Sequence, residues 1–233
     1  MSFEQIIKAA RVEKQAVDEA ELALINAQTL APKTAESLFA FRLRACDNQV
    51  DRDRERFTDR TLDQLAELFV GRPVLRDHNW SAGSQTARIY AAGTEMRDGV
   101  KMLILRAYMP RSNRTANTIT DIESGILREA SVGVKVERAL CSVCGEDYYA
   151  CPHQRGEEYE GKACYVELDN ALDAYEVSFV AVPAQKDSGV VKRYEAKEKS
   201  RDPGPAETGH ENTQAQQMAE ALQALEEHRY GGM

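Results

Sequence analysis

Three cysteines and one histidine stand close together in the sequence at Cys141, Cys144, Cys151 and His153. Three thiolates and one imidazole complete the tetrahedral shell that Zn²⁺ prefers, and the Cys-x-x-Cys pair followed by Gly145 is typical of a zinc knuckle. A catalytic zinc normally keeps one position open for water, whereas here the protein would supply all four ligands. The pattern therefore predicts a structural zinc site, in which Cys164 either replaces His153 as the fourth ligand or stays free.

The segment around these residues, "CSVCGEDYYACPHQRGEEYEGKAC", is too polar to build a hydrophobic core of its own. Zinc binding contributes about 10 to 16 kcal/mol to the folding of small peptides, which is enough to order a loop of this size. We therefore expect residues 139–165 to form a zinc-binding insertion between two strands.

Composition supports metal ligation over disulfide bonding. The chain has 233 residues, a formal charge of -8 and a pI near 5.2. Neither a secretory leader nor an apolar run of about 18 residues is visible, so we expect a cytoplasmic protein whose thiols stay reduced. The acidic balance also disfavours a nucleic-acid partner, including a zinc-ribbon binder, because phosphate neutralisation needs a basic face.

A second chemistry is suggested by one histidine and one serine. The chain has four histidines, of which His210 and His228 fall in or beyond a linker, so a metal-bound His153 would leave His78 for the core. Ser131 lies in "EASVGVKVE", a strand-like run with small neighbours, where Gly133 would permit close approach of a substrate backbone. Each residue alone is more often structural. Together they match the base and nucleophile of a serine hydrolase.

Three blocks, "RPVLRDHNW", "GILREASVGVKV" and "AYEVSFVAVPA", resemble in type and order the signatures of the prohead maturation proteases of tailed bacteriophages. These are serine peptidases related in fold to the herpesvirus assemblins. The resemblance covers about residues 38–188, and it implies Ser131 as nucleophile, His78 as general base and Glu176 as the carboxylate that orients the histidine. The cysteine insertion departs from the simplest family pattern. It leaves Glu129 as the second choice of carboxylate, whereas Asp77 in an extended segment would face away from the site.

The resemblance further implies a serine endopeptidase that matures capsids by cleaving scaffold and major capsid proteins, and itself, with backbone N–H groups near Gly133 as oxyanion donors. It would act in the host cytoplasm, inside the assembling prohead, without a membrane or nucleic-acid partner, and homo-oligomers remain open. Ser178, in an apolar strand, is interpreted as structural. The alternative is a non-catalytic, zinc-stabilised protein that binds scaffold or assists capsid assembly.

Periodicity predicts an α+β fold, and the resemblance makes its sheet a small, mostly antiparallel β-barrel flanked by helices. We expect strands from residue 38, around an Asp98-Gly99 hairpin turn, and over the second and third blocks. Helices are predicted over residues 2–28, after a cap at Thr61, and between residues 110 and 125. The predicted parts are an N-terminal helical extension (1–34), a protease domain (35–192), and a disordered linker with a C-terminal helix (193–233), where self-cleavage would fall.

Overall fold

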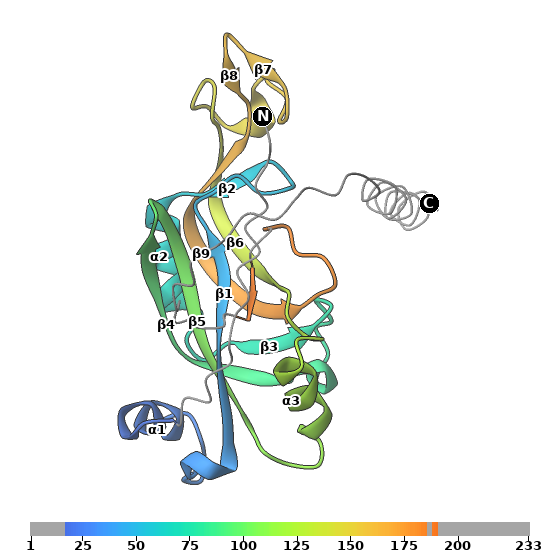
Figure 1. Cartoon of the computed structure of the whole chain (residues 1–233). Coiled ribbons are helices and arrows are strands. Elements are labelled where there is room, and N and C mark those ends of the chain that lie inside the picture. The colour runs from blue at the N-terminus through green and yellow to red at the C-terminus, as the bar shows by residue number, and fades with distance from the viewer. Residues whose placement is uncertain (1–16, 186–187, 191–233) are drawn as a thin grey trace, which may run out of the picture. The chain divides into compact units, whose positions relative to one another are not determined.

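A computed structural model describes residues 17–185 and 188–190, all of which belong to one unit of the chain, 1–194. It is a mixed α+β structure dominated by one large sheet (Figure 1). The predictions for the first 16 residues and for the linker and C-terminal helix lie outside the described residues. No helix within the described part is long and apolar enough to cross a membrane.

Three antiparallel strands form the middle of the sheet: β1 (Leu38–Asp47), β4 (Ala87–Arg97) and β5 (Val100–Pro110). The predicted alternation in β1 is present, with Phe39, Phe41 and Leu43 buried in the core. The turn between β4 and β5 has φ of 51° at Asp98 and 79° at Gly99. Positive φ at both residues is what a tight two-residue hairpin turn requires, so the Asp-Gly signal correctly located this hairpin.

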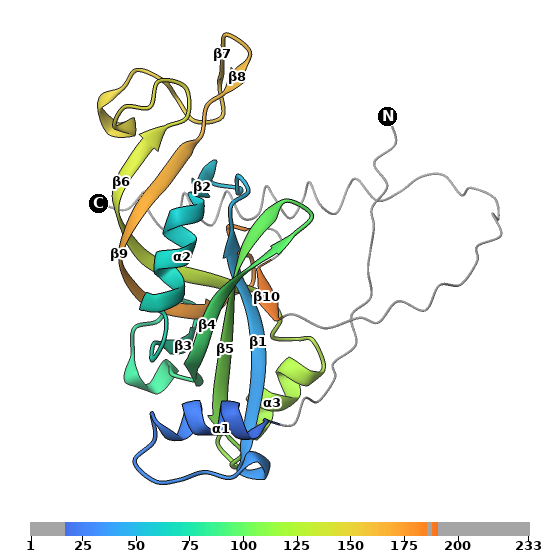
Figure 2. The same cartoon turned by 90° about the vertical axis from the view of Figure 1, so that its left-hand side faces the viewer.

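One helix covers the core side of the sheet. Helix α2 (Asp59–Leu68) contacts β4, β5 and β9, and its Leu62 and Leu65 are fully buried (Figure 2). Its N-cap is Thr58, whose side chain accepts a hydrogen bond from the Thr61 backbone. The predicted cap at Thr61 was therefore wrong, because two threonines at this spacing both offer a capping hydroxyl and the earlier one is used.

The second half of the sheet is built on two long antiparallel strands, β6 (Ala130–Cys141) and β9 (Val166–Phe179). On its other side β9 pairs in parallel with β3 (Pro73–Arg76) and β2 (Glu55–Phe57). The β6–β9 ribbon carries the cysteine-rich insertion at one end (Figure 1). The remaining elements are α1 (Glu19–Asn26), α3 (Ala116–Glu123), β7 (Glu158–Tyr159), β8 (Lys162–Ala163), β10 (Gly189–Val190) and three short 3₁₀ helices at Ala35–Ser37, Ala82–Ser84 and Tyr148–Ala150.

The sheet does not close into a barrel, contrary to the expectation from the resemblance. The strand order is β10-β1-β5-β4-β3-β9-β2, with β6 paired to β9. One isolated bridge, between Glu129 and Gly189, joins the start of β6 to β10. Within the described residues, β10 reaches only this bridge, while the β6–β9 ribbon continues to the cysteine insertion. An open seam remains along the outer edge of β6.

The described part of the N-terminal extension is docked on the sheet. Ile25 of α1 is fully buried in a small second core with Leu38, Tyr90 and Tyr108. The Tyr90 hydroxyl donates a hydrogen bond to Glu21 at 3.0 Å. Apolar burial and this hydrogen bond hold α1 against β4.

Candidate functional site

His78 lies in a tight turn at the end of β3. Both Asp77 and His78 have positive φ, 53° and 50°, and two backbone contacts tie the turn to β9. The Asp77 N–H donates to the Phe179 carbonyl at 2.9 Å, and the His78 N–H donates to the Ser178 hydroxyl at 3.0 Å. The expected extended conformation at Asp77 was therefore wrong. Left-handed backbone at two adjacent non-glycine residues is strained, and such strain persists where surrounding contacts impose it.

The imidazole of His78 contacts a buried carboxylate. Its Nδ1 lies 2.7 Å from Oε1 of Glu176, a side chain that is only 2% exposed. The other carboxylate oxygen, Oε2, accepts a hydrogen bond from the Ser178 hydroxyl at 2.6 Å. Both oxygens of Glu176 are thus partnered, which a buried carboxylate requires.

This contact sets the protonation of His78. The hydrogen bond to Glu176 raises the pKa of His78, burial opposes that rise, and the charges of Glu176 and Asp77 add to it. The His78 side chain is still 41% exposed, so a ligand can reach the ring. A histidine held on one side by a carboxylate and open on the other is suited to proton transfer.

Gly133 makes room for the carboxylate. It is the register partner of Glu176 across the β6–β9 ladder, and a Cβ at this position would lie 2.4 Å from Oε1 of Glu176. Any larger residue would therefore displace the oxygen that contacts His78. The sequence suggested that Gly133 admits a substrate backbone. On this face of β6, the Glu176 side chain occupies that space instead.

Ser131 shares the face of the sheet that carries this contact. It is the register partner of Ser178 and stands two residues before Gly133 on β6. Side chains at directly opposed positions of an antiparallel pair lie on one face, with Cβ atoms about 4.5 to 5.5 Å apart. Ser131 is partly exposed, and its hydroxyl makes no hydrogen bond to other described residues. Ser131 and the His78–Glu176 contact thus share one face of the sheet, and no hydrogen bond joins the imidazole to the Ser131 hydroxyl.

The rival residues occupy different positions. Glu129 precedes β6 and forms a backbone bridge to Gly189, whereas the carboxylate at the imidazole is that of Glu176. Ser178 is fully buried, and its hydroxyl is engaged by both Glu176 and the His78 backbone. It anchors the other two residues, a role that sequence reasoning missed. The detectable signal was the Glu-x-Ser spacing, which puts both side chains on one face of a strand.

A β-bulge interrupts the regular pairing of β9 with β6 beside this site. The register steps from Gly133–Glu176 to Val134–Ala174, which leaves Tyr175 as the extra residue. The Tyr175 ring packs on Trp80, with ring centroids 5.3 Å apart, and Trp80 is 68% exposed. No local sequence pattern indicates this aromatic pair, because the two residues are far apart in the chain.

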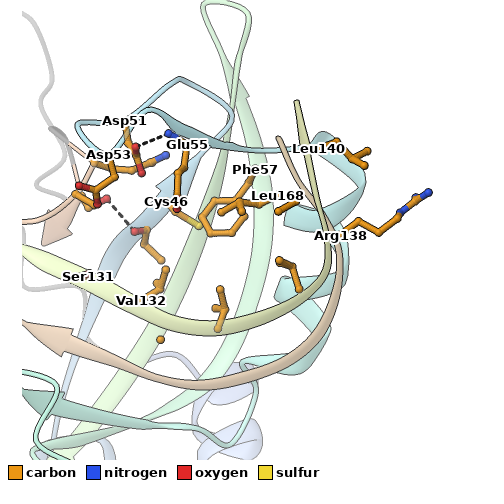
Figure 3. Close-up of a pocket in the computed structure, with 18 of the residues that line it drawn as sticks. Cys46, Asp51, Asp53, Glu55, Phe57, Ser131, Val132, Arg138, Leu140 and Leu168 are labelled. Carbon is orange, nitrogen blue, oxygen red and sulfur yellow. Dashed lines mark hydrogen bonds between the residues drawn. The ribbon is translucent and has the colours of Figure 1, made fainter. Parts of the chain in front are cut away.

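A cavity of about 830 Å³ lies beside β6. Its wall includes Ser131 and Gly133, but neither His78 nor Glu176. Figure 3 shows Ser131 and Val132 on one wall and Asp51, Asp53 and Glu55 on another. The cavity and the His78–Glu176 contact therefore meet at the strand that carries Ser131.

The four predicted metal ligands come together at the far end of β6. One donor atom from each of Cys141, Cys144, Cys151 and His153 lies within 4.8 Å of the others, and Cys141 Sγ is 3.6 Å from Nδ1 of His153. Burial would raise the pKa of Cys141, but backbone N–H groups of Cys144 and Val143 and neighbouring thiols lower it to about 6. This donor set fits a metal ion, because amides directed at a sulfur stabilise the thiolate that ligation requires.

Cys164 stands beside this group. Its Sγ is 3.8 Å from that of Cys141, yet it is not one of the four donors that lie mutually within 4.8 Å. Burial, with the neighbouring thiols, raises the pKa of Cys164 to about 11. The geometry favours His153 over Cys164 as the fourth donor.

Comparisons with known protein families, with curated proteins and with solved structures each found no match. Function is therefore inferred from the geometry of the two sites.

The pKa of His78, followed by NMR, tests the contact with Glu176. We expect a value above the ordinary 6.5, and a lower value in Glu176→Gln, because the amide removes the negative partner. The exposed Glu123→Gln serves as the control and should leave the titration unchanged. Since the folded pKa is raised, the stability from this pair is fully present below about pH 6.5 and is lost as pH rises through the folded pKa.

The same titration examines the role of Gly133. Gly133→Ala should lower the pKa of His78, because the new methyl group pushes Glu176 away from the ring. Gly93→Ala is a matched control on β4, where a Cβ meets nothing within 4 Å. Equal His78 pKa values in the two alanine variants would contradict the assigned role of Gly133.

Proposed function

We propose that this chain is a serine endopeptidase of the prohead-protease kind, with Ser131 as nucleophile, His78 as general base and Glu176 as the orienting carboxylate. The observation that carries the proposal is the 2.7 Å contact between His78 and buried Glu176, on the sheet face that also bears Ser131. A carboxylate-bound histidine and a serine hydroxyl on one face are the group types that serine hydrolases use on unrelated folds.

The proposed reaction begins when the Ser131 oxygen attacks a peptide carbonyl and its proton passes to His78. Because Nδ1 of His78 faces Glu176, Nε2 is the atom that takes this proton. His78 then protonates the leaving amine, and a water molecule releases the acyl group by the same steps in reverse. Glu176 stays ionised throughout and stabilises the imidazolium cation.

Two further groups complete the proposed mechanism. Ser178 anchors the carboxylate from one side and the turn of His78 from the other, so it is a positioning residue. Backbone N–H groups near Ser131 and Gly133 would bind the oxyanion, and each such donor contributes about 2.7 to 4 kcal/mol in comparable enzymes. Because only neutral His78 can act as a base, activity should rise with pH through its raised pKa.

The biological role follows from the sequence resemblance. We propose that the substrates are scaffold and capsid proteins in an assembling prohead within the host cytoplasm, and that the open sheet is a variant of the assemblin-like barrel. Self-cleavage would fall in the segment after residue 194. The curl of the sheet, with a single bridge between β10 and the start of β6, is consistent with a barrel opened at one seam.

We further propose that the four-donor group binds Zn²⁺ in a structural role. Thiolate and imidazole donors in a tetrahedral set favour zinc in a reducing compartment. Within the insertion, residues 139–165, Cys141 and Cys164 are buried and most other residues are exposed. Apolar packing therefore contributes little to the order of this segment. Zinc would supply that order.

Labelling with a fluorophosphonate probe tests the nucleophile. We expect covalent modification at Ser131, and loss of labelling and of peptide cleavage in Ser131→Ala, by about 10⁴-fold or more. Ser124→Ala, at an exposed helix end, should behave as the wild type. Cleavage that persists in folded Ser131→Ala would exclude this nucleophile. A wild-type protein that never labels would favour the non-catalytic assembly protein.

Metal content, measured by mass spectrometry on protein purified without chelator, tests the zinc proposal. We expect about one zinc per chain, lost in Cys144→Ser and Cys151→Ser, because each removes one of the four ligands. Cys164→Ser is the discriminating variant and should retain the metal. If Cys164→Ser loses zinc while His153→Ala retains it, the fourth ligand is Cys164 and not His153. Metal-free wild-type protein would contradict the zinc site altogether.

A further inference from the structure

The outer edge of β6 has no strand partner over most of its length. Among the described residues, β6 pairs with β9 alone, and its other edge is bridged only at the ends, at Glu129–Gly189 and Leu140–Asp147. Between these bridges, the outward-facing backbone N–H and C=O groups have no ladder partner in the part of the chain that the structure describes. Such an edge is a ready template for an extended chain.

The cavity runs along this free edge. Ten of the eleven residues from Ala130 to Leu140 line it, all except Lys135, so the strand borders it lengthwise. The opposite wall comes from the end of β1, the Asp51–Glu55 segment and residues 184, 185 and 188 (Figure 3). A groove of this form fits an extended peptide, and Ser131 stands at one end of it.

The opposite wall is acidic. Asp51, Asp53 and Glu55 line this wall. Glu137 of β6 and Asp147 add further carboxylates to the lining of the cavity. The one basic residue that lines the cavity, Arg138, is paired with Asp169 across the ladder. Arg155 of the insertion forms an ion pair with Glu55 at 2.6 Å and also lowers the pKa of Asp51 through its charge. The groove therefore has a surplus of negative charge.

Burial adds to the significance of this charge. Desolvation is the largest cause of the raised pKa of both Asp51 and Glu55, and neighbouring carboxylates raise each of them further. Partly buried carboxylates that repel one another bind a cationic group more strongly than exposed ones do, because screening by water is reduced.

We propose that the groove binds an extended substrate segment that carries Lys or Arg, adds as a strand to the free edge of β6, and places its basic side chains against Asp51, Asp53 and Glu55. The position of the scissile bond at Ser131 rests on the proposed peptidase function. The binding of the segment does not.

Binding can be measured without cleavage in full-length Ser131→Ala. The probes are three fluorescein-labelled nonapeptide pools, identical except for two central positions occupied by Lys, Gln or Glu. We expect the Lys pool to bind about tenfold more tightly than the Gln pool, with the Glu pool weakest. Equal affinities for the three pools, or no binding of any, would overturn the proposal.

Matched variants locate the effect. Asp53→Asn, and Asp51→Asn, which keeps the acceptor for the Glu55 N–H, should each weaken the Lys pool several-fold and leave the Gln pool unchanged. Asp98→Asn, at the exposed β4–β5 turn, is the control and should change neither. Two results would show that the basic side chain does not bind at Asp51 and Asp53. One is a preference for the Lys pool that is lost in Asp98→Asn alone, and the other is a preference that persists in the double variant Asp51→Asn/Asp53→Asn.

Strand addition has its own signature. In an antiparallel ladder, only alternate residues of the added strand hydrogen-bond to the edge. Peptides from the Lys pool that are N-methylated at one alternating set of amides should lose binding, and those methylated at the other set should retain it. Equal tolerance of both sets would exclude the strand mode. If the peptides bind in this way but wild-type protein is not labelled by a fluorophosphonate, the groove proposal stands and the peptidase proposal fails. If wild-type protein is labelled but the peptides do not bind, the peptidase proposal stands and the groove proposal fails.

Discussion

The site depends on one buried carboxylate that must be satisfied. Glu176 is 2% exposed, and a carboxyl group so far from water is tolerated only when both oxygens have partners. His78 and Ser178 supply them, at 2.7 and 2.6 Å. The glycine opposite Glu176 clears the space for its carboxylate, and the left-handed turn at Asp77 and His78 brings the imidazole within reach.

The β6–β9 ribbon joins the two candidate sites and keeps them apart. Ser131 and Cys141 lie at opposite ends of β6, about 33 Å apart along a strand that rises about 3.3 Å per residue. At that distance a metal would take no part in the proposed chemistry at Ser131. It would instead secure the end where Cys141 pairs with Val166, and so limit fraying of the strand that borders the groove.

Local signals were sufficient for part of this structure. The Asp98-Gly99 turn, the alternation in β1 and the spacing of Cys141, Cys144, Cys151 and His153 each depend on neighbours in the chain, and each is found in place. The positions of His78, Ser131 and Glu176 depend on β9 lying between β3 and β6. The resemblance grouped these three residues but did not predict that strand order. Ser178, the role of Gly133 and the unclosed seam beside β6 arise from pairings between distant strands, and no local pattern encodes those.

The pH dependence of probe attachment at Ser131 tests most directly whether the buried Glu176 governs the chemistry. The rate constant for fluorophosphonate labelling should rise with pH with a midpoint equal to the pKa of His78 measured in the same protein, and Glu176→Gln should move both values down together. A labelling rate that does not change with pH, or a midpoint that stays fixed while the pKa of His78 moves, would contradict the account.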